Sequence, residues 1–329
     1  MKAELSKEVK IYLRHKKQKR FIENVFFFCL IAGMCFAILY PVIKLFPTVL
    51  CDLEDLGNPD VIWIPIKKSV LSFTAAWRLM MKNGWMTMGY TIGYSAIIML
   101  VEVFISAMIG FALARVKFKG SNVIFFLVIL VFLVPPQALL LSQYIHFKNF
   151  DILGIFQMFT GDTLDLIDKP VTLFLLGLTG FGVNQSLYIF IFRQFFKNIP
   201  KELEEAAMID GCGFNKTYFK IMLPNAKPAI STVAVLGFVW NYGDTYYTGY
   251  FNPGGGYLSY ILQTVFDSAN KEYTLNALKV WYKLPLVNDF SFDAVKQASI
   301  LIYLIPLLIV YFIAQHWLVE NLENSGIVG

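Results

Sequence analysis

The sequence predicts an all-α polytopic membrane protein with six transmembrane helices. Of its 329 residues, 57% are hydrophobic and only 16% are charged, whereas a soluble domain carries about a quarter charged residues. A water-soluble fold of this size would not enclose so much Phe, Leu and Ile. Four stretches of the length that crosses a bilayer contain no Lys, Arg, Asp or Glu, namely 24–43, 121–147, 170–192 and 297–319.

Two further apolar stretches are each interrupted by a single acid, Glu102 in one and Asp244 in the other. They complete the six predicted spans, which are 24–46, 86–114, 121–147, 170–192, 228–250 and 297–319. We expect a basic N-terminal segment at 1–23 and a cytoplasmic tail at 320–329. Between the spans we expect outer loops at 47–85 and 251–296 and a cytoplasmic loop at 193–227. Residues 86–319 form the predicted core.

The orientation follows from the basic residues. Eight Lys and Arg residues precede the first span, which places the N-terminus in the cytoplasm by the positive-inside rule. With six spans, the C-terminus lies there too. The basic run 14–20 is expected to anchor this end at anionic lipid, and no nucleic-acid partner is expected. The first span is too long for a cleaved signal and is expected to remain in the mature protein.

The two outer loops are long enough to fold and are expected to form a docking surface or a cap over a gate. The apolar segment 257–266 is too short to span, so it is expected to lie at the membrane interface or to re-enter the membrane.

The cytoplasmic loop is predicted to contain two short helices. Asn198 is expected to cap the first, and Gly211 is expected to end it because glycine tolerates the left-handed conformation. Leu203, Ala206 and Ala207 recur at helical spacing and make a face of small side chains that another protein can approach closely. From the residues alone, a hairpin lying on the membrane surface remains an equal alternative.

The loop resembles the Glu-Ala-Ala loop of the membrane subunits of binding-protein-dependent ABC importers. The matching residues are Glu205, Ala206, Ala207, Asp210, Gly211, Leu223 and Pro224. The resemblance implies the type I ABC importer permease fold and assigns this loop to the coupling helix that sits in a cleft of the ATP-binding subunit.

The resemblance extends over about 88–329, specifically to the second permease of maltose-type carbohydrate importers. It is carried by 112–120, by Val134-Pro135-Pro136, and by Ala298, Pro306, Gln315 and the tail. The sequence departs from that pattern at Trp240-Asn241-Tyr242-Gly243-Asp244 and in the tail 325–329. These departures affect the expectation of which solute is carried and how transport is regulated more than they affect the expected transport mechanism.

Motifs for catalysis or cofactor binding are missing from the sequence. No phosphate-binding Gly-x-x-x-x-Gly-Lys-Ser/Thr run occurs, Gly211-x-Gly213 is only a fragment of a dinucleotide pattern, and the histidines and the four cysteines are scattered. We therefore expect a transport subunit that is not an enzyme and binds no metal or cofactor. ATP and Mg are expected on the partner ATPase.

Isolated polar residues inside predicted spans are the candidates for a solute pathway. They are Trp240, Asn241, Asp244, Asn184, Gln185, Gln137 and Glu102. Aromatic faces with amide or carboxylate edges suit sugar rings. Two alternatives stay open, because Gln137 can satisfy backbone groups freed by a proline kink, and Glu102 can be protonated or paired with a neighbouring span.

Taken together, the resemblance implies a permease subunit in a bacterial cytoplasmic (inner) membrane that imports a carbohydrate of oligosaccharide size. The expected partners are an ABC ATPase dimer, a second homologous permease, an extracellular or periplasmic solute-binding protein and membrane lipid. The alternatives are a permease of the same fold for a polyamine, phosphate or glycerol phosphate, and a membrane receptor or scaffold that transports nothing.

Overall fold

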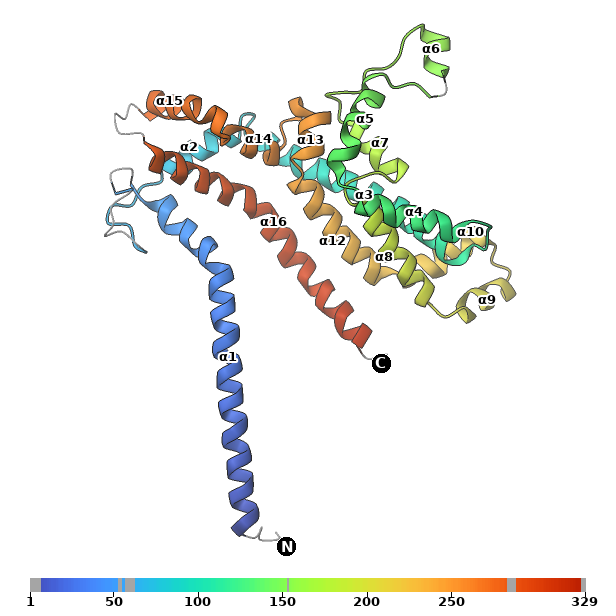
Figure 1. Ribbon diagram of the computed structural model, residues 1–329, viewed down its shortest axis with the longest axis horizontal. Coiled ribbons are helices and arrows are strands. Elements are labelled where there is room, and N and C mark those ends of the chain that lie inside the picture. Colours follow the sequence, from blue (N-terminus) through green and yellow to red (C-terminus); the bar gives the residue numbers. More distant parts are fainter. Residues whose placement is uncertain (1–6, 53–54, 57–62, 153, 283–287, 327–329) are drawn as a thin grey trace. The chain divides into compact units, whose positions relative to one another are not determined.

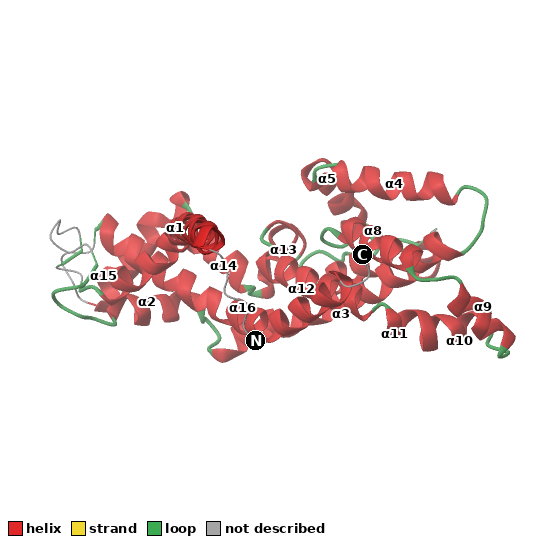
Figure 2. Cartoon of the chain, turned by 90° about the horizontal axis from the view of Figure 1, so that it is seen from below, coloured by secondary structure: helices red, strands yellow, loops and turns green. Residues whose placement is uncertain are grey.

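The computed structural model describes residues 7–52, 55–56, 63–152, 154–282 and 288–326. Within these ranges the regular structure is helical, which confirms the all-α prediction (Figures 1 and 2). The longer helices are α1 (Lys7–Leu50), α3 (Trp85–Arg115), α4 (Ser121–Leu133), α5 (Pro136–Lys148), α8 (Gln185–Asn198), α12 (Lys227–Gly243), α15 (Lys271–Tyr282) and α16 (Asp289–Gly326). The shorter ones are α2 (Leu71–Met80), α6 (Ile155–Thr160), α7 (Val171–Thr179), α9 (Glu202–Ile209), α10 (Phe214–Thr217), the π-helix η1 (Tyr218–Met222), α11 (Leu223–Asn225), α13 (Tyr246–Phe251), α14 (Leu258–Val265) and the 3-10 turns η2 (Pro253–Gly255) and η3 (Ser268–Asn270).

The chain divides into two compact units. The first comprises 1–75 and 278–298, and it contains α1. The backbone after α1 is held by hydrogen bonds from Asp52 N to Lys67 O (3.0 Å) and from Ser69 N to Leu50 O (2.9 Å). The most apolar window of α1 buries no residue inside the chain, so its apolar surface is available to lipid or another subunit.

The second unit comprises 76–277 and 299–329, and α3 is its central helix. This helix packs against α7, α8 and α12. Glycines allow the close approach, because a Cβ at Gly110 would lie 2.6 Å from Phe192 Cβ, and one at Gly237 would lie 3.3 Å from Met99 Cγ. Small residues at helix contacts are the usual means of close packing in membranes.

The predicted span 121–147 is bent, and a second bend lies just before the predicted span 228–250. Helices α4 and α5 meet at 102° in the predicted span 121–147, where Pro135 and Pro136 cannot donate the backbone hydrogen bonds that a straight helix needs. Helices 214–225 and α12 meet at 74°. By length and composition, the described residues contain three helices able to cross a membrane, or five if each bent pair is one span. The count of six therefore stays a prediction.

The predicted fourth span, 170–192, is not one continuous helix. It is divided into α7 and α8, and the break contains Gly180 and Asn184, whose φ angles are +86° and +55°. Both angles lie in the left-handed region, which ends a right-handed helix. The first half is short, and the second half continues to Asn198, beyond the predicted boundary.

The predicted fifth span, 228–250, is also interrupted. Helix α12 ends at Gly243, and α13 begins at Tyr246. The carboxylate of Asp244 accepts hydrogen bonds from the backbone N–H groups of Tyr246, Tyr247 and Thr248, at 3.2, 3.2 and 2.7 Å. Asp244 thus satisfies the first amides of α13 and starts a new helix where the prediction continues the old one. The segment 257–266 forms α14, which is partly buried within the chain.

Candidate functional site

The loop predicted to be cytoplasmic folds as expected around Gly211. The φ of Gly211 is +75°, and its N–H donates to Met208 O at 3.1 Å while Cys212 N–H donates to Ala207 O at 2.9 Å. These two bonds are the Schellman pair that satisfies the last carbonyls of a helix. The predicted helix stop is confirmed, with Asp210 as the exposed residue between α9 and Gly211.

The other end of α9 differs from the prediction. Asn198 does not cap it, because Asn198 is the last residue of α8, and Lys201 occupies the capping position without a side-chain hydrogen bond. Three carboxylates, Glu202, Glu204 and Glu205, lie in the first turn of α9. Negative charge there complements the positive end of the helix dipole.

The exposed face of α9 also differs from the prediction. Ala207 is 3% exposed and packs inside the chain, so it does not share an outward face with Leu203 and Ala206. Met208 and Ile209 are 59% and 86% exposed. Exposed apolar side chains of this size mark a contact surface for another protein or for a membrane. We call Leu203, Ala206, Met208 and Ile209 the α9 outer face.

The loop is packed firmly against the ends of α3 and α8. The rings of Phe111 and Tyr218 lie 4.8 Å apart, and those of Phe111 and Phe196 lie 5.4 Å apart. Burial raises the pKa of Tyr218 to about 12 because its phenolate would be poorly solvated. Met222 is fully buried in the same cluster. A displacement of α9 and η1 is therefore transmitted to the membrane helices through a packed core.

The remaining predicted coupling residues, Leu223 and Pro224, belong to α11, directly after the π-helix η1. Leu223 is half-buried against the loop core, and Pro224 is exposed. Single π-turns are frequent at functional sites, and this one adjoins the 74° bend that leads into α12.

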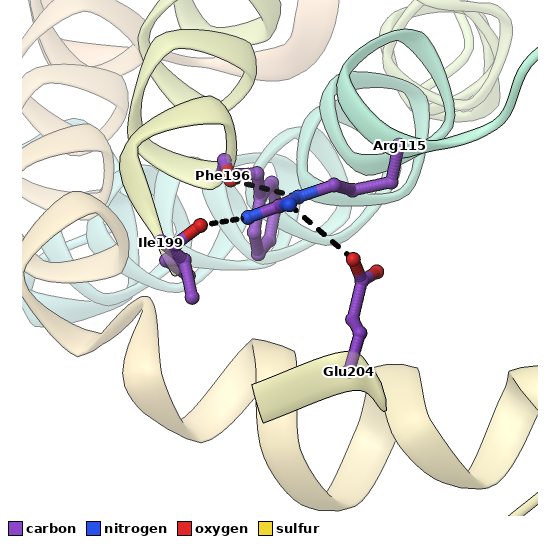
Figure 3. A network of polar contacts seen from close by, with 4 residues as sticks. All are labelled: Arg115, Phe196, Ile199 and Glu204. Atoms are coloured by element: carbon purple, nitrogen blue, oxygen red, sulfur yellow. Dashed lines mark hydrogen bonds and ion pairs between the residues drawn. The ribbon is translucent and has the colours of Figure 1, made fainter. Parts of the chain in front are cut away.

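Arg115, at the end of α3, joins three elements at this site (Figure 3). Its Nε donates to Phe196 O at 3.0 Å, and its Nη2 donates to Ile199 O. Its Nη1 lies 3.3 Å from Glu204 Oε2 on α9. Sequence reasoning missed Arg115 as a site residue, although it lies within the segment 112–120 that carries the family resemblance.

The candidate solute residues Glu102 and Asn241 are bonded to each other. Asn241 Nδ2 donates to Glu102 Oε2 at 2.7 Å and to Gly237 O at 2.9 Å. Glu102 is 0% exposed. Glu102 is therefore paired with a neighbouring helix, as one of the two alternatives expects. Both side chains join α3 to α12, and Glu102 does not reach the chain surface.

Gln185 has a structural position at the break between α7 and α8. Its Nε2 donates to Gly177 O at 2.8 Å, and its Oε1 accepts from Gly182 N at 2.8 Å. Glu102 packs against the same break, since a Cβ added at Gly182 would clash with Glu102 and Gln185. Gln185 therefore satisfies backbone groups that the break leaves without helical partners.

Asn184 lies at a pocket between the two discontinuous helix pairs, the α4–α5 bend and the α7–α8 break. The pocket is open to the surface and has a cavity volume of about 60 Å³. Its lining combines polar groups with apolar faces, and its residues are Val131, Phe132, Val134, Pro136, Leu139, Gln143, Gly180, Phe181, Gly182, Asn184, Ser186 and Tyr247. Gln143 Oε1 has no hydrogen-bond partner in the described chain. Sequence reasoning did not select Gln143 or Tyr247.

The other candidates lie apart from this pocket's lining. Trp240 is 48% exposed, and Gln137 is exposed next to Pro136. Asp244 is engaged with α13 as described above. Among the described residues, no group of three or more His, Cys, Asp and Glu side chains is arranged to hold a metal ion.

Sequence comparisons identify relatives of this chain. The permease protein AraQ of an arabinooligosaccharide transport system in Halalkalibacterium halodurans is 26% identical over 247 residues, which is 74% of this chain and 75% of that protein. A probable permease for starch degradation products, AmyC of Thermoanaerobacterium thermosulfurigenes, is 29% identical over 70% of each chain.

Among solved structures, a chain of a bacterial ABC transporter involved in the import of the acidic polysaccharide alginate matches with a TM-score of 0.66 and 21% identity. The match covers 91% of this chain and 97% of that chain, so it shows a shared fold. The model of the family described as "Binding-protein-dependent transport system inner membrane component" matches residues 103–324. This chain is a membrane protein of that family.

Proposed function

We propose that this chain forms half of the translocation pathway of an ABC importer for a carbohydrate of oligosaccharide size. The observation that carries the proposal is the α9 outer face, an exposed apolar surface on a helix whose other side is packed onto α3 and α8. The family match supports the transport role. The relatives named for arabinooligosaccharides and starch degradation products support a carbohydrate, and they do not favour a polyamine, phosphate or glycerol phosphate.

The α9 outer face is the proposed docking surface for an ATP-binding subunit. Its apolar residues are bordered by the exposed carboxylates Glu205 and Asp210, which set the orientation of a partner through charge. ATP and Mg belong to that partner in this proposal. Two copies of the ATPase would engage this chain and a second, homologous permease, and a solute-binding protein would deliver the solute from outside.

The pocket beside Asn184 is the proposed contribution of this chain to the solute pathway. Discontinuous helices supply binding sites within membranes because their free backbone groups face a cavity. Amide and hydroxyl groups from Gln143, Asn184 and Ser186 would bind sugar hydroxyls, and the faces of Phe132 and Tyr247 would contact sugar C–H groups.

The proposed location is a bacterial cytoplasmic (inner) membrane, with both termini and α9 on the cytoplasmic side. The basic residues near the N-terminus support this orientation. Residues 1–6 and 327–329, which complete the predicted cytoplasmic ends, lie outside the described residues.

Purification of the tagged chain from native membranes in mild detergent tests the docking proposal. An ATP-binding subunit and a second permease should co-purify in stoichiometric amounts. Ile209→Glu places a charge in the α9 outer face and should remove the ATPase, because a desolvated carboxylate has no partner there. Met158→Glu is the control, since Met158 is 85% exposed on α6. Retention of the ATPase by Ile209→Glu would contradict docking at this face.

Transport is tested with the purified complex in proteoliposomes. Labelled arabino- and malto-oligosaccharides are the probes, and spermidine and glycerol 3-phosphate represent the alternative solutes. ATP-dependent uptake of an oligosaccharide supports the proposal. Uptake of spermidine or glycerol 3-phosphate alone would replace the carbohydrate assignment, and an assembled complex with no uptake of any probe would favour a scaffold.

A further inference from the structure

Arg115 occupies a position where three elements end or begin close together. The last carbonyls of a helix lack partners within it, and those of Phe196 and Ile199 at the end of α8 accept hydrogen bonds from Arg115. The guanidinium also lies near the negative end of the α8 dipole, where a cation is stabilising. Arg115 therefore attaches the end of α3 to the end of α8.

The same guanidinium reaches the coupling loop. Its third nitrogen lies 3.3 Å from Glu204 of α9, and the two side chains are only 6% and 16% exposed. A planar guanidinium directs its donors along several fixed directions at once, whereas the ammonium of lysine is a point charge. In this arrangement Arg115 holds two carbonyls and a carboxylate with three separate nitrogens.

Glu204 and Ala207 lie three residues apart and so share one side of α9. Ala207 is buried against the chain, and Glu204 is held by Arg115. The inner side of α9 thus has an apolar and an ionic attachment, while Met208 and Ile209 stay exposed on the outer face. If the ion pair between Glu204 and Arg115 were lost, α9 could rotate about the apolar contact of Ala207.

We infer that Arg115 is a positioning residue that fixes the orientation of α9 relative to α3 and α8. A force applied to the α9 outer face then moves both membrane helices together. The inference rests on the proposed function only for the source of that force, which is the ATPase. The orientation of α9 is a property of this chain and is measured separately.

Spin labels on Met208→Cys and Asn122→Cys, in a background with the native cysteines replaced by serine, report the position of α9 relative to α4. The full chain is measured in lipid nanodiscs without an ATPase, because Met208 belongs to the α9 outer face. Glu204→Gln removes the charge but keeps the shape, and Glu202→Gln on the same helix is the control because Glu202 is exposed. We expect Glu204→Gln to broaden the distance distribution and Glu202→Gln to leave it unchanged.

Two further variants separate positioning from general folding damage. Glu204→Asp keeps the charge and should restore part of the narrow distribution. Arg115→Gln should broaden the distribution, and adding Glu204→Gln to it should cause no further change, since the two residues act as a pair. Equal widths in the wild type and Glu204→Gln would overturn the inference. Absence of a co-purified ATPase would instead count against the proposed function, and the distance measurement would still decide the role of Arg115.

Discussion

Asn241 of α12 donates a hydrogen bond of 2.7 Å to Glu102 of α3, and Glu102 has no exposed surface. The two residues are 139 positions apart in the sequence. Their bond joins two membrane helices next to the break between α7 and α8. A polar pair in this position holds helices together in an environment where neither residue would find water.

The effect of replacing Glu102 depends on whether an acceptor for Asn241 remains. Glu102→Gln keeps a carbonyl oxygen, so we expect a loss of less than about 0.6 kcal/mol in the free energy of unfolding, the average for such bonds in membranes. Glu102→Leu leaves the Asn241 amide without this acceptor, and we expect a loss of about 1–3 kcal/mol. Denaturant unfolding in detergent measures both, with the exposed Trp240→Ala as control. Equal losses for Gln and Leu would contradict a role for the hydrogen bond.

Gly110 gives the second prediction. A Cβ there would lie 2.6 Å from Phe192 Cβ and 2.9 Å from the backbone nitrogen of Arg193. Neither atom is at the end of a flexible side chain, so α3 and α8 would have to move apart. We expect Gly110→Ala to destabilise the chain by about 1–3 kcal/mol, as measured by thermal unfolding in detergent. Gly93→Ala on the same helix meets no atom within 4 Å and should cause no loss.

That the chain consists of apolar membrane helices could be predicted, because uncharged runs of about 20 residues have few other uses. Their interruptions could not, since hydropathy records the polarity of side chains and not the backbone angle. Gly180 and Asn184 lie in an uncharged run, and only their left-handed φ angles divide it. Similarly, hydropathy shows Asp244 only as a charged residue within an apolar run. In the structure its carboxylate accepts hydrogen bonds from the first amides of the next helix.

The loop around Gly211 is the most predictable part of the candidate site because its signal is local. The spacing around Gly211 specifies a helix stop within a few residues, and the stop is present. The side of α9 that faces the chain depends on contacts with distant residues such as Arg115. The sequence spacing of Leu203, Ala206 and Ala207 contains no information on those contacts, so it predicts an outward position for Ala207 that the structure does not show.

The third prediction concerns the left-handed conformation of Gly211. An L-residue with a Cβ costs roughly 1–2 kcal/mol in that conformation, so Gly211→Ala should weaken the two Schellman bonds at the end of α9. Hydrogen exchange at the amides of Gly211 and Cys212 should become faster, and less ATPase should co-purify. Gly213→Ala is the matched control, because Gly213 has a φ of −71° and open space around it. Slower exchange or full ATPase recovery in Gly211→Ala would contradict the prediction.

The last prediction separates the two faces of α9 directly. In a background with the native cysteines replaced by serine, a cysteine at Met208 should react quickly with a maleimide, since that position is 59% exposed. A cysteine at Ala207, which is 3% exposed, should react about tenfold more slowly, because local opening must precede the reaction. If the cysteine at 208 reacts only when the maleimide is added from the cytoplasmic side, the proposed topology is supported. Bound ATPase should protect this cysteine from reaction. If instead 207 reacted as fast as 208, or 208 stayed reactive in the assembled complex, the α9 outer face would not be the surface that docks the ATPase.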